Sequence, residues 1–261
     1  MNLGLDGKTA LVVGGGGGLG SAVARALARE GAQVAVAGRD QGSAGRTAEA
    51  IAVDGGEAFA IHLDLTDLGS LDAALESIGA RSGEIEILFN NSGGPPPTTA
   101  AGQPVALWRE HFEAMVIGVI ALTDRVLPSM RERGWGRIIT TTSSGIAAPL
   151  PNLALSNSLR LAVVGWSKTL AAEVAADGVT VNVVVPGRIA TGRVRALDEA
   201  RAKREGTTVE AAAAASIASI PAGRYGDPDE YAAAVAFLAG EPASYITGAT
   251  LRVDGGQIRS L

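Results

Sequence analysis

Residues 9–20 read TALVVGGGGGLG, an apolar run that passes through five consecutive glycines into an alanine-rich stretch. Glycines let a chain turn tightly, let backbone N–H groups approach a pyrophosphate, and let a strand and a helix pack closely. The N-terminus of the helix that follows stabilises negative charge. We therefore predict a strand, a phosphate-binding turn and a helix that starts near Leu19. A merely flexible glycine turn is the alternative, and the strand–turn–helix context argues against it.

The rest of the chain alternates in the same way. Apolar, β-branched runs predict strands at 9–14, 33–38, 58–64, 85–90, 136–142, 179–186 and 249–256. Several of them are continuous, as in strands that are buried on both faces of a parallel sheet. Alanine-rich stretches predict helices at 19–30, 43–54, 67–81, 107–131, 156–176 and 228–239. The pattern predicts an α/β fold, a doubly wound parallel sheet (Rossmann fold) with helices on both faces. A chain of 261 residues fits a single domain, 1–261.

Two segments depart from this alternation. Residues 90–104 form a Gly/Pro-rich loop straight after a predicted strand, and residues 187–226 form a long polar insert after another. Doubly wound folds bind ligands at the carboxyl ends of their strands. We therefore predict a substrate lid at 187–226, with a surface helical excursion as the alternative.

Composition excludes several functional classes. The chain carries a net charge of −5 and has no cysteine and two histidines. A nucleic-acid partner, a disulfide framework and a His- or Cys-ligated metal site are therefore not expected. The sequence also lacks a basic segment followed by a long apolar run near its start, and no run has the length of a membrane span. We expect a cytoplasmic protein with no membrane association.

Several motifs resemble those of the short-chain dehydrogenase/reductase family along nearly the whole chain. The glycine run is similar to the family's TGxxxGxG pattern through Gly14, Gly18 and Gly20, with Val13 in place of threonine. Further similar segments are HLDLTD (62–67), NNSG (90–93), VTVNVVVPGRIAT (179–191) and ITGATLRVDGG (246–256). The resemblance implies an NAD(P)(H)-dependent oxidoreductase, and a homotetramer or homodimer. The cofactor-binding residues that it implies are Gly14, Gly16, Gly18, Leu19, Gly20, Arg39, Asp64, Leu65, Asn91, Ser92, Gly93, Arg160, Pro186, Gly187, Ile189 and Thr191.

The end of the second predicted strand bears on the choice of cofactor. NAD-preferring folds usually carry an acidic residue there, whereas this chain has Gly38 followed by Arg39. A guanidinium can bind the 2′-phosphate, so NADP(H) is predicted. NAD remains possible because the glycine turn carries no basic residue and Asp40 could contact the ribose.

The catalytic positions depart from the family pattern. The family uses a serine, a tyrosine, a lysine and an asparagine, and alignment on the flanking segments GRIIT (136–140) and GWSKTLAAEVA (165–175) leaves no gap between them. The serine falls on Ser143, the tyrosine on Ser156, the lysine on Arg160 and the asparagine on Met115. Serine is a far weaker acid than tyrosine, and arginine does not relay protons as lysine does.

Three interpretations follow from these replacements. In the first, carbonyl reduction or alcohol oxidation persists: Ser143 and Ser156 polarise the oxygen, Arg160 supplies charge and anchors the ribose, and water completes the proton transfer. In the second, the protein binds NADP(H) without turnover, as a sensor or assembly subunit. In the third, it is an isomerase or dehydratase on the same fold. We favour the first, because the segment that would clasp the nicotinamide is intact.

The substrate is predicted to be a small molecule, and an anionic one if a group of arginines after the sixth predicted strand binds it. Arg188, Arg193 and Arg195 could attract a carboxylate or a phosphate. The alternative is ordinary solvated charge on a lid.

Overall fold

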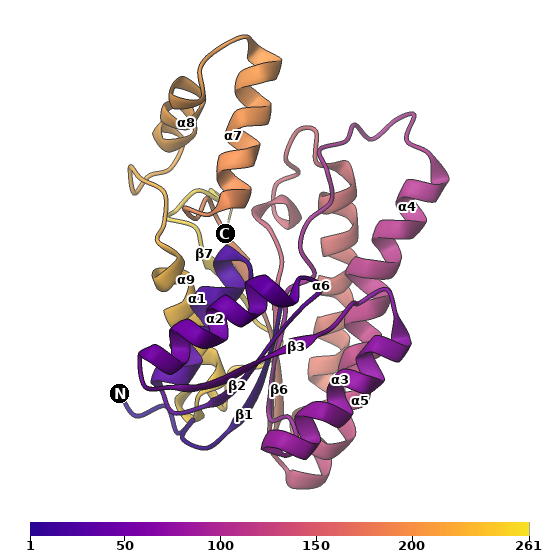
Figure 1. The fold of residues 1–261 in the computed structure, drawn as a ribbon. Helices are drawn as coiled ribbons and strands as arrows, with labels where there is room; N and C mark the ends of the chain where they lie inside the picture. The colour runs from indigo at the N-terminus through magenta and orange to yellow at the C-terminus, as the bar shows by residue number, and fades with distance from the viewer. Residues whose placement is uncertain (261) are drawn as a thin grey trace.

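A seven-stranded parallel sheet organises residues 1–260, the part of the chain that the computed structural model describes (Figure 1). The strands are β1 (Thr9–Val13), β2 (Gln33–Gly38), β3 (Glu57–His62), β4 (Ile87–Asn90), β5 (Gly136–Thr141), β6 (Val179–Pro186) and β7 (Thr250–Val253). Their order is β3-β2-β1-β4-β5-β6-β7 and every neighbouring pair is parallel. The predicted fold class is confirmed, and each predicted strand is present.

The order of the strands reverses between β1 and β4. At such a point the connections leave in opposite directions, and a crevice opens at the carboxyl ends of the strands. The glycine turn follows β1, and the NNSG segment spans the end of β4 and the start of the following loop. The fold therefore brings these two motifs to the same edge of the sheet.

Helices cover both faces of the sheet (Figure 1). One face carries α1 (Gly18–Arg29), α2 (Gln41–Val53) and α9 (Pro228–Ala239), and the other carries α3 (Leu68–Ser82), α5 (Gly118–Arg133) and α6 (Ala154–Val174). The sequence of β1 is continuously apolar because both of its faces are buried. Ala10 and Val12 pack into the core on the side of α1, α2 and α9, and Leu11 and Val13 pack into the core on the side of α3, α5 and α6. Each side chain is buried, whichever face it points to.

The helix predicted at 107–131 has a different structure. It consists of α4 (Val105–Phe112), a π-helical turn at Glu113–Ile117, and α5. The widened turn precedes Gly118, which approaches the chain after β3 so closely that a Cβ atom there would lie 2.1 Å from the carbonyl oxygen of Leu65. Turns of this kind often occur at functional sites, and this one carries Met115.

Residues 187–226 contain two further helices, α7 (Gly192–Glu205) and α8 (Val209–Ala218), which project beyond the carboxyl ends of the strands (Figure 1). The two ends of this segment meet at its base. There the N–H of Ala190 donates to the carbonyl of Gly226 at 2.8 Å, and the N–H of Gly226 donates to the carbonyl of Arg188 at 2.9 Å. We call 187–226 the α7–α8 excursion.

Across residues 1–260, no helix has both the length and the apolar character that crossing a membrane requires.

Candidate functional site

The glycine turn is shaped by close approaches that only glycine permits. Gly14 has a positive φ of 67°, and its carbonyl accepts a hydrogen bond from the N–H of Gly17 at 3.1 Å. A Cβ atom at Gly20 would lie 2.1 Å from the carbonyl oxygen of Gly14. A Cβ atom at Gly18 would lie 2.7 Å from Cγ2 of Thr191, so the turn also contacts the chain after β6. These contacts hold α1 with its N-terminus at the crevice, where an anion is stabilised.

A cavity of about 900 Å³ lies at this edge of the sheet, and most of its lining is apolar. Many of the residues predicted for a site contribute to its wall: Gly18, Leu19, Asn91, Gly93, Ser143, Ser156, Arg160, Pro186, Gly187, Ile189 and Thr191. Others do not line it: Gly14, Gly16, Gly20, Arg39, Asp64, Leu65, Ser92 and Met115. The three glycines shape the turn, whereas Arg39, Asp64 and Leu65 lie at the ends of β2 and β3, on the other side of β1 from β4.

At the end of β2, the carboxylate of Asp40 is engaged by the start of α2. It accepts a hydrogen bond from the N–H of Gly42 at 3.0 Å and one from the hydroxyl of Ser43. These hydrogen bonds, chiefly the one from Ser43, lower the pKa of Asp40. Asp40 is therefore a helix cap, and a ribose would have to compete with that cap for the carboxylate.

Arg39 is exposed at the same place, next to Asp64. Burial alone would raise the pKa of the Asp64 carboxyl, but two hydrogen bonds from Thr66 and the charge of Arg39 outweigh it and lower the pKa. No hydrogen bond or ion pair occupies the Arg39 guanidinium among residues 1–260. A free cation thus stands where a 2′-phosphate of adenosine is expected.

Ser143 follows β5 and caps a short 3₁₀ turn, Ser144–Ile146, with its Oγ accepting from the N–H of Gly145 at 3.2 Å. Ser156 is buried in the first turns of α6. Arg160 lies one turn later, and its Nε donates to Oγ of Ser156 at 3.3 Å. Ser156 and Arg160 therefore share one helix face, which the i, i+4 spacing predicts.

Arg160 also contacts β5 and the loop that follows β4. It donates to the carbonyl of Thr141 at 3.2 Å and to the carbonyl of Gly93. Burial and then the positive charge of Arg193 lower its pKa to about 10. The group still carries its charge at neutral pH.

Met115, at the expected position of the asparagine, is buried in the core that α3, α5 and α6 form. A thioether is at best a weak hydrogen-bond acceptor. This side chain cannot hold a water molecule as an amide would.

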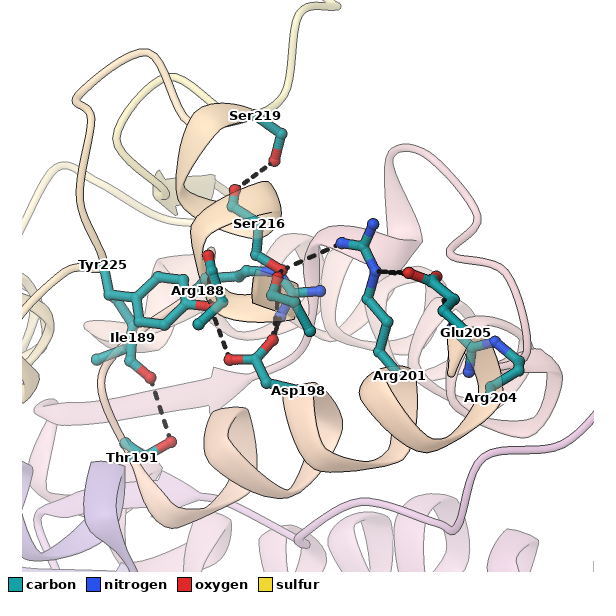
Figure 2. Close-up of polar contacts among 12 residues, drawn as sticks. Arg188, Ile189, Thr191, Asp198, Arg201, Arg204, Glu205, Ser216, Ser219 and Tyr225 are labelled. Atoms are coloured by element: carbon teal, nitrogen blue, oxygen red, sulfur yellow. Dashed lines mark hydrogen bonds and ion pairs between the residues drawn. The ribbon is translucent and has the colours of Figure 1, made fainter. Parts of the chain in front are cut away.

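The α7–α8 excursion has a polar interior that the sequence analysis missed (Figure 2). Asp198 of α7 is only 2% exposed, and it accepts hydrogen bonds from Arg188 at 3.0 Å, from the hydroxyl of Tyr225 at 2.7 Å and from Ser216 of α8 at 3.3 Å. Arg188 is thus paired, and Arg195 is 80% exposed and bound to Glu199. Of the three arginines singled out in the sequence, Arg188 and Arg193 line the cavity and Arg195 does not.

Tyr231 was also missed, because it lies far along the sequence from α6. It is fully buried in α9, and its hydroxyl donates to Oγ1 of Thr141 at 2.7 Å. Thr141 lines the cavity, whereas Tyr231 does not. Burial raises the pKa of Tyr231, and the hydrogen bond with Thr141 and the charge of Arg160 together offset only part of that rise.

Among residues 1–260, no group of three or more histidine, cysteine, aspartate or glutamate side chains is placed to hold a metal ion.

Comparison with known proteins places this geometry in a family. A family model described as "Enoyl-(Acyl carrier protein) reductase" matches residues 14–257. The 3-oxoacyl-[acyl-carrier-protein] reductase of Salmonella typhimurium is 37% identical over 254 residues, which cover 96% of this chain and 97% of that protein.

Solved structures agree with the sequence matches. L-sorbose reductase from Gluconobacter frateurii, complexed with NADPH and L-sorbose, superimposes with a TM-score of 0.94 at 30% identity and full coverage of both chains. YwfH, an NADPH-dependent reductase involved in bacilysin biosynthesis, gives a TM-score of 0.92 at 28% identity, over 97% of this chain and 99% of that one. The chain belongs to the short-chain dehydrogenase/reductase family.

Proposed function

We propose that this protein is an NADP(H)-dependent oxidoreductase that reduces a carbonyl group, or oxidises the corresponding alcohol, without the tyrosine and lysine that the family resemblance implies. The observation that carries the proposal is the convergence of Ser143, Ser156 and Arg160 on the cavity that the glycine turn and residues 186–191 also line. Relatives with this fold include NADPH-dependent reductases.

The residues present fit a dinucleotide. The glycine turn and the N-terminus of α1 would hold the pyrophosphate, and Arg39 would hold the adenosine 2′-phosphate. Asn91, Gly93, Pro186, Gly187, Ile189 and Thr191 would surround the nicotinamide and its ribose, with Ser92 beside them. Asp64 and Leu65 would lie with Arg39 at the adenosine end of the cofactor. When bound, NADPH supplies the hydride.

The chain's own part in the reaction is electrostatic. Ser143 and Ser156 would donate hydrogen bonds to the carbonyl oxygen, and Arg160 would stabilise the negative charge that develops there. Arg160 is protonated throughout the neutral range, so it contributes charge and not a proton. Water would deliver the proton, because no tyrosine lines the cavity in the described part of the chain.

We further propose that the α7–α8 excursion is the substrate lid of a single domain. Val194, Leu197 and Ala200 of α7 supply one wall of the cavity, and Arg193 at its first turn donates to the carbonyl of Pro95 at 2.8 Å. Closure over the site would shield the reacting groups from bulk solvent and retain only the water that donates the proton.

The protein is also proposed to form a homodimer or homotetramer. Phe112, Ile117 and Leu161 are exposed apolar residues on α4, the π-helical turn and α6. Apolar patches on helices commonly mark subunit contacts. Light scattering coupled to size-exclusion chromatography tests this, and a monomer at all concentrations would contradict it.

The experiment that tests the function is NADPH oxidation, measured against a panel of ketones, diketones and quinones. Arg160→Ala and Ser143→Ala should each lower kcat by about 10²-fold or more, since each removes a group aimed at the developing charge. Micromolar NADPH binding with no turnover above background would favour a silent NADP(H)-binding sensor. Turnover that both substitutions leave unchanged would refute the assignment of the site.

A further inference from the structure

Two arginines face the same point in the cavity without an acidic partner. Arg160 donates to the carbonyl of Gly93 and Arg193 donates to the carbonyl of Pro95, on either side of Gly94. A Cβ atom at Gly94 would lie 3.2 Å from Nη2 of Arg193 and 3.6 Å from Nη2 of Arg160. The space next to Gly94 is therefore bordered by both guanidinium groups.

The charge in this space is not neutralised by the protein. Among residues 1–260, neither Arg160 nor Arg193 has a carboxylate within ion-pair distance, and their hydrogen bonds go to three carbonyls and to Ser156. The other cavity arginines are paired, Arg188 with Asp198 and both Arg201 and Arg204 with Glu205. Arg160 uses three of its five N–H donors and Arg193 one, so several remain free.

We infer that Arg160, Arg193 and the bare backbone of Gly94 form a binding site for a carboxylate of the substrate. Two positive groups of like charge, held near one another in a largely apolar cavity, are stabilised by an anion between them. Gly94 does not have a positive φ, so its backbone allows an alanine, but the added methyl group would press on the Arg193 guanidinium at 3.2 Å and on the space beside it.

The position of the site narrows the class of substrate. Arg160 also donates to Ser156, the hydroxyl that we propose to polarise the carbonyl. An anion held by Arg160 would therefore lie beside the reacting carbon, as the carboxylate of a 2-oxo or 3-oxo acid does. That the reacting group is a carbonyl rests on the proposed function. That an anion binds beside it rests on the two arginines alone.

A phosphate of the cofactor is the other source of such an anion. The arrangement favours the substrate, because Thr191 makes the contact of the α7–α8 excursion with the glycine turn, whereas Arg193 reaches the Gly/Pro-rich loop 90–104 at Pro95. The experiment must distinguish the two sources.

The test uses oxalate, a small unreactive dicarboxylate, and isothermal titration calorimetry on the full-length protein, both alone and saturated with NADP⁺. Arg193→Gln should weaken oxalate binding about 10- to 100-fold, the size expected for a hydrogen-bonded ion pair. Gly94→Ala, which removes no charge but displaces the Arg193 guanidinium and narrows the space beside it, should weaken oxalate binding at least about tenfold. Arg195→Gln is the matched control: it removes the same charge two residues along, from an exposed pair with Glu199, and should change binding less than twofold.

Each outcome decides the inference. Binding of oxalate that all three variants leave alike, or no binding at all, would overturn it. Oxalate that competes with NADP⁺, together with weaker NADPH binding in Arg193→Gln, would assign the anion to the cofactor and overturn it equally. Turnover of neutral ketones without oxalate binding would support the proposed function and refute the anion site. Oxalate binding at the two arginines without any turnover would support the anion site and refute the proposed function.

Discussion

The stability of the α7–α8 excursion should depend on the buried carboxylate of Asp198, and the substitution Asp198→Asn tests this. The side chain keeps its shape and loses its charge. Arg188, whose side chain is 27% exposed, then loses its ionic partner, and one of the three donors around Asp198 faces an amide N–H. Breaking a fully buried ion pair costs about 3–5 kcal/mol and a charged hydrogen bond about 1.5–3 kcal/mol. Because Arg188 is partly solvated, we expect Asp198→Asn to destabilise the α7–α8 excursion by about 2–3 kcal/mol.

This cost should appear as local opening, because Asp198, Ser216 and Tyr225 join α7, α8 and the following loop to one another and not to the sheet. Hydrogen exchange measured by mass spectrometry should show amides of 192–218 exchanging roughly 30- to 150-fold faster. Exchange in the central strands should be unchanged.

Glu199→Gln provides the control on the same helix. Its pair with Arg195 is exposed, so the loss should stay below about 0.5 kcal/mol and the exchange rate within about twofold of wild type. If Asp198→Asn changes the exchange of 192–218 no more than Glu199→Gln does, the buried carboxylate does not hold the excursion together. Faster exchange throughout the sheet would show that the loss is global, which also contradicts the reasoning.

Three further predictions concern the cofactor and the catalytic charge. Arg39→Ala should raise the Kd for NADPH about tenfold and leave the Kd for NADH nearly unchanged, since only NADPH carries the 2′-phosphate; equal losses in a fluorescence titration would remove Arg39 from that role. Gly20→Ala should abolish NADPH binding and lower the Tm, because its Cβ would overlap the carbonyl of Gly14, whereas Gly45→Ala in α2, with nothing within 4 Å of a new Cβ, should leave the Tm unchanged or raise it. The rate of carbonyl reduction should fall as the pH rises through about 10, the pKa of Arg160, because the positive charge that stabilises the developing oxyanion is then lost. If Arg160→Ala shows the same fall in rate near pH 10, another group causes it.

The fold was predictable because its signals are local and repeated. Each strand was predicted from an apolar run. Central strands such as β1 have such runs because both of their faces are buried. The interruption at Glu113–Ile117 was not predictable, because a π-helical turn keeps the composition of the helices around it. The contact between Ser156 and Arg160 was also predictable, because residues four apart in a helix lie on the same face.

Contacts between distant segments were the part that sequence could not supply. Asp198 and Tyr225 look like ordinary polar residues of an insert until folding buries them together. Arg193 and Arg195 are indistinguishable in sequence, yet one turns toward Gly94 and the other toward solvent and Glu199. The side of α7 that faces the cavity decides this, and the hydrophobic periodicity of so polar a helix does not specify it.

Tyr231 could in principle supply the proton that the family resemblance assigns to a tyrosine at position 156, but its environment argues against this role. Its hydroxyl is committed to Thr141, it has no exposure to the cavity, and burial raises its pKa. Tyr231→Phe should therefore cost about 1 kcal/mol of stability and change kcat by no more than a few-fold. A general acid that works through Thr141 would instead lose about 10²- to 10⁴-fold in kcat, together with the solvent deuterium isotope effect of that proton transfer. The size of the change in kcat thus separates a structural hydroxyl from a displaced proton donor, and a loss above about 10²-fold would refute delivery of the proton by water alone.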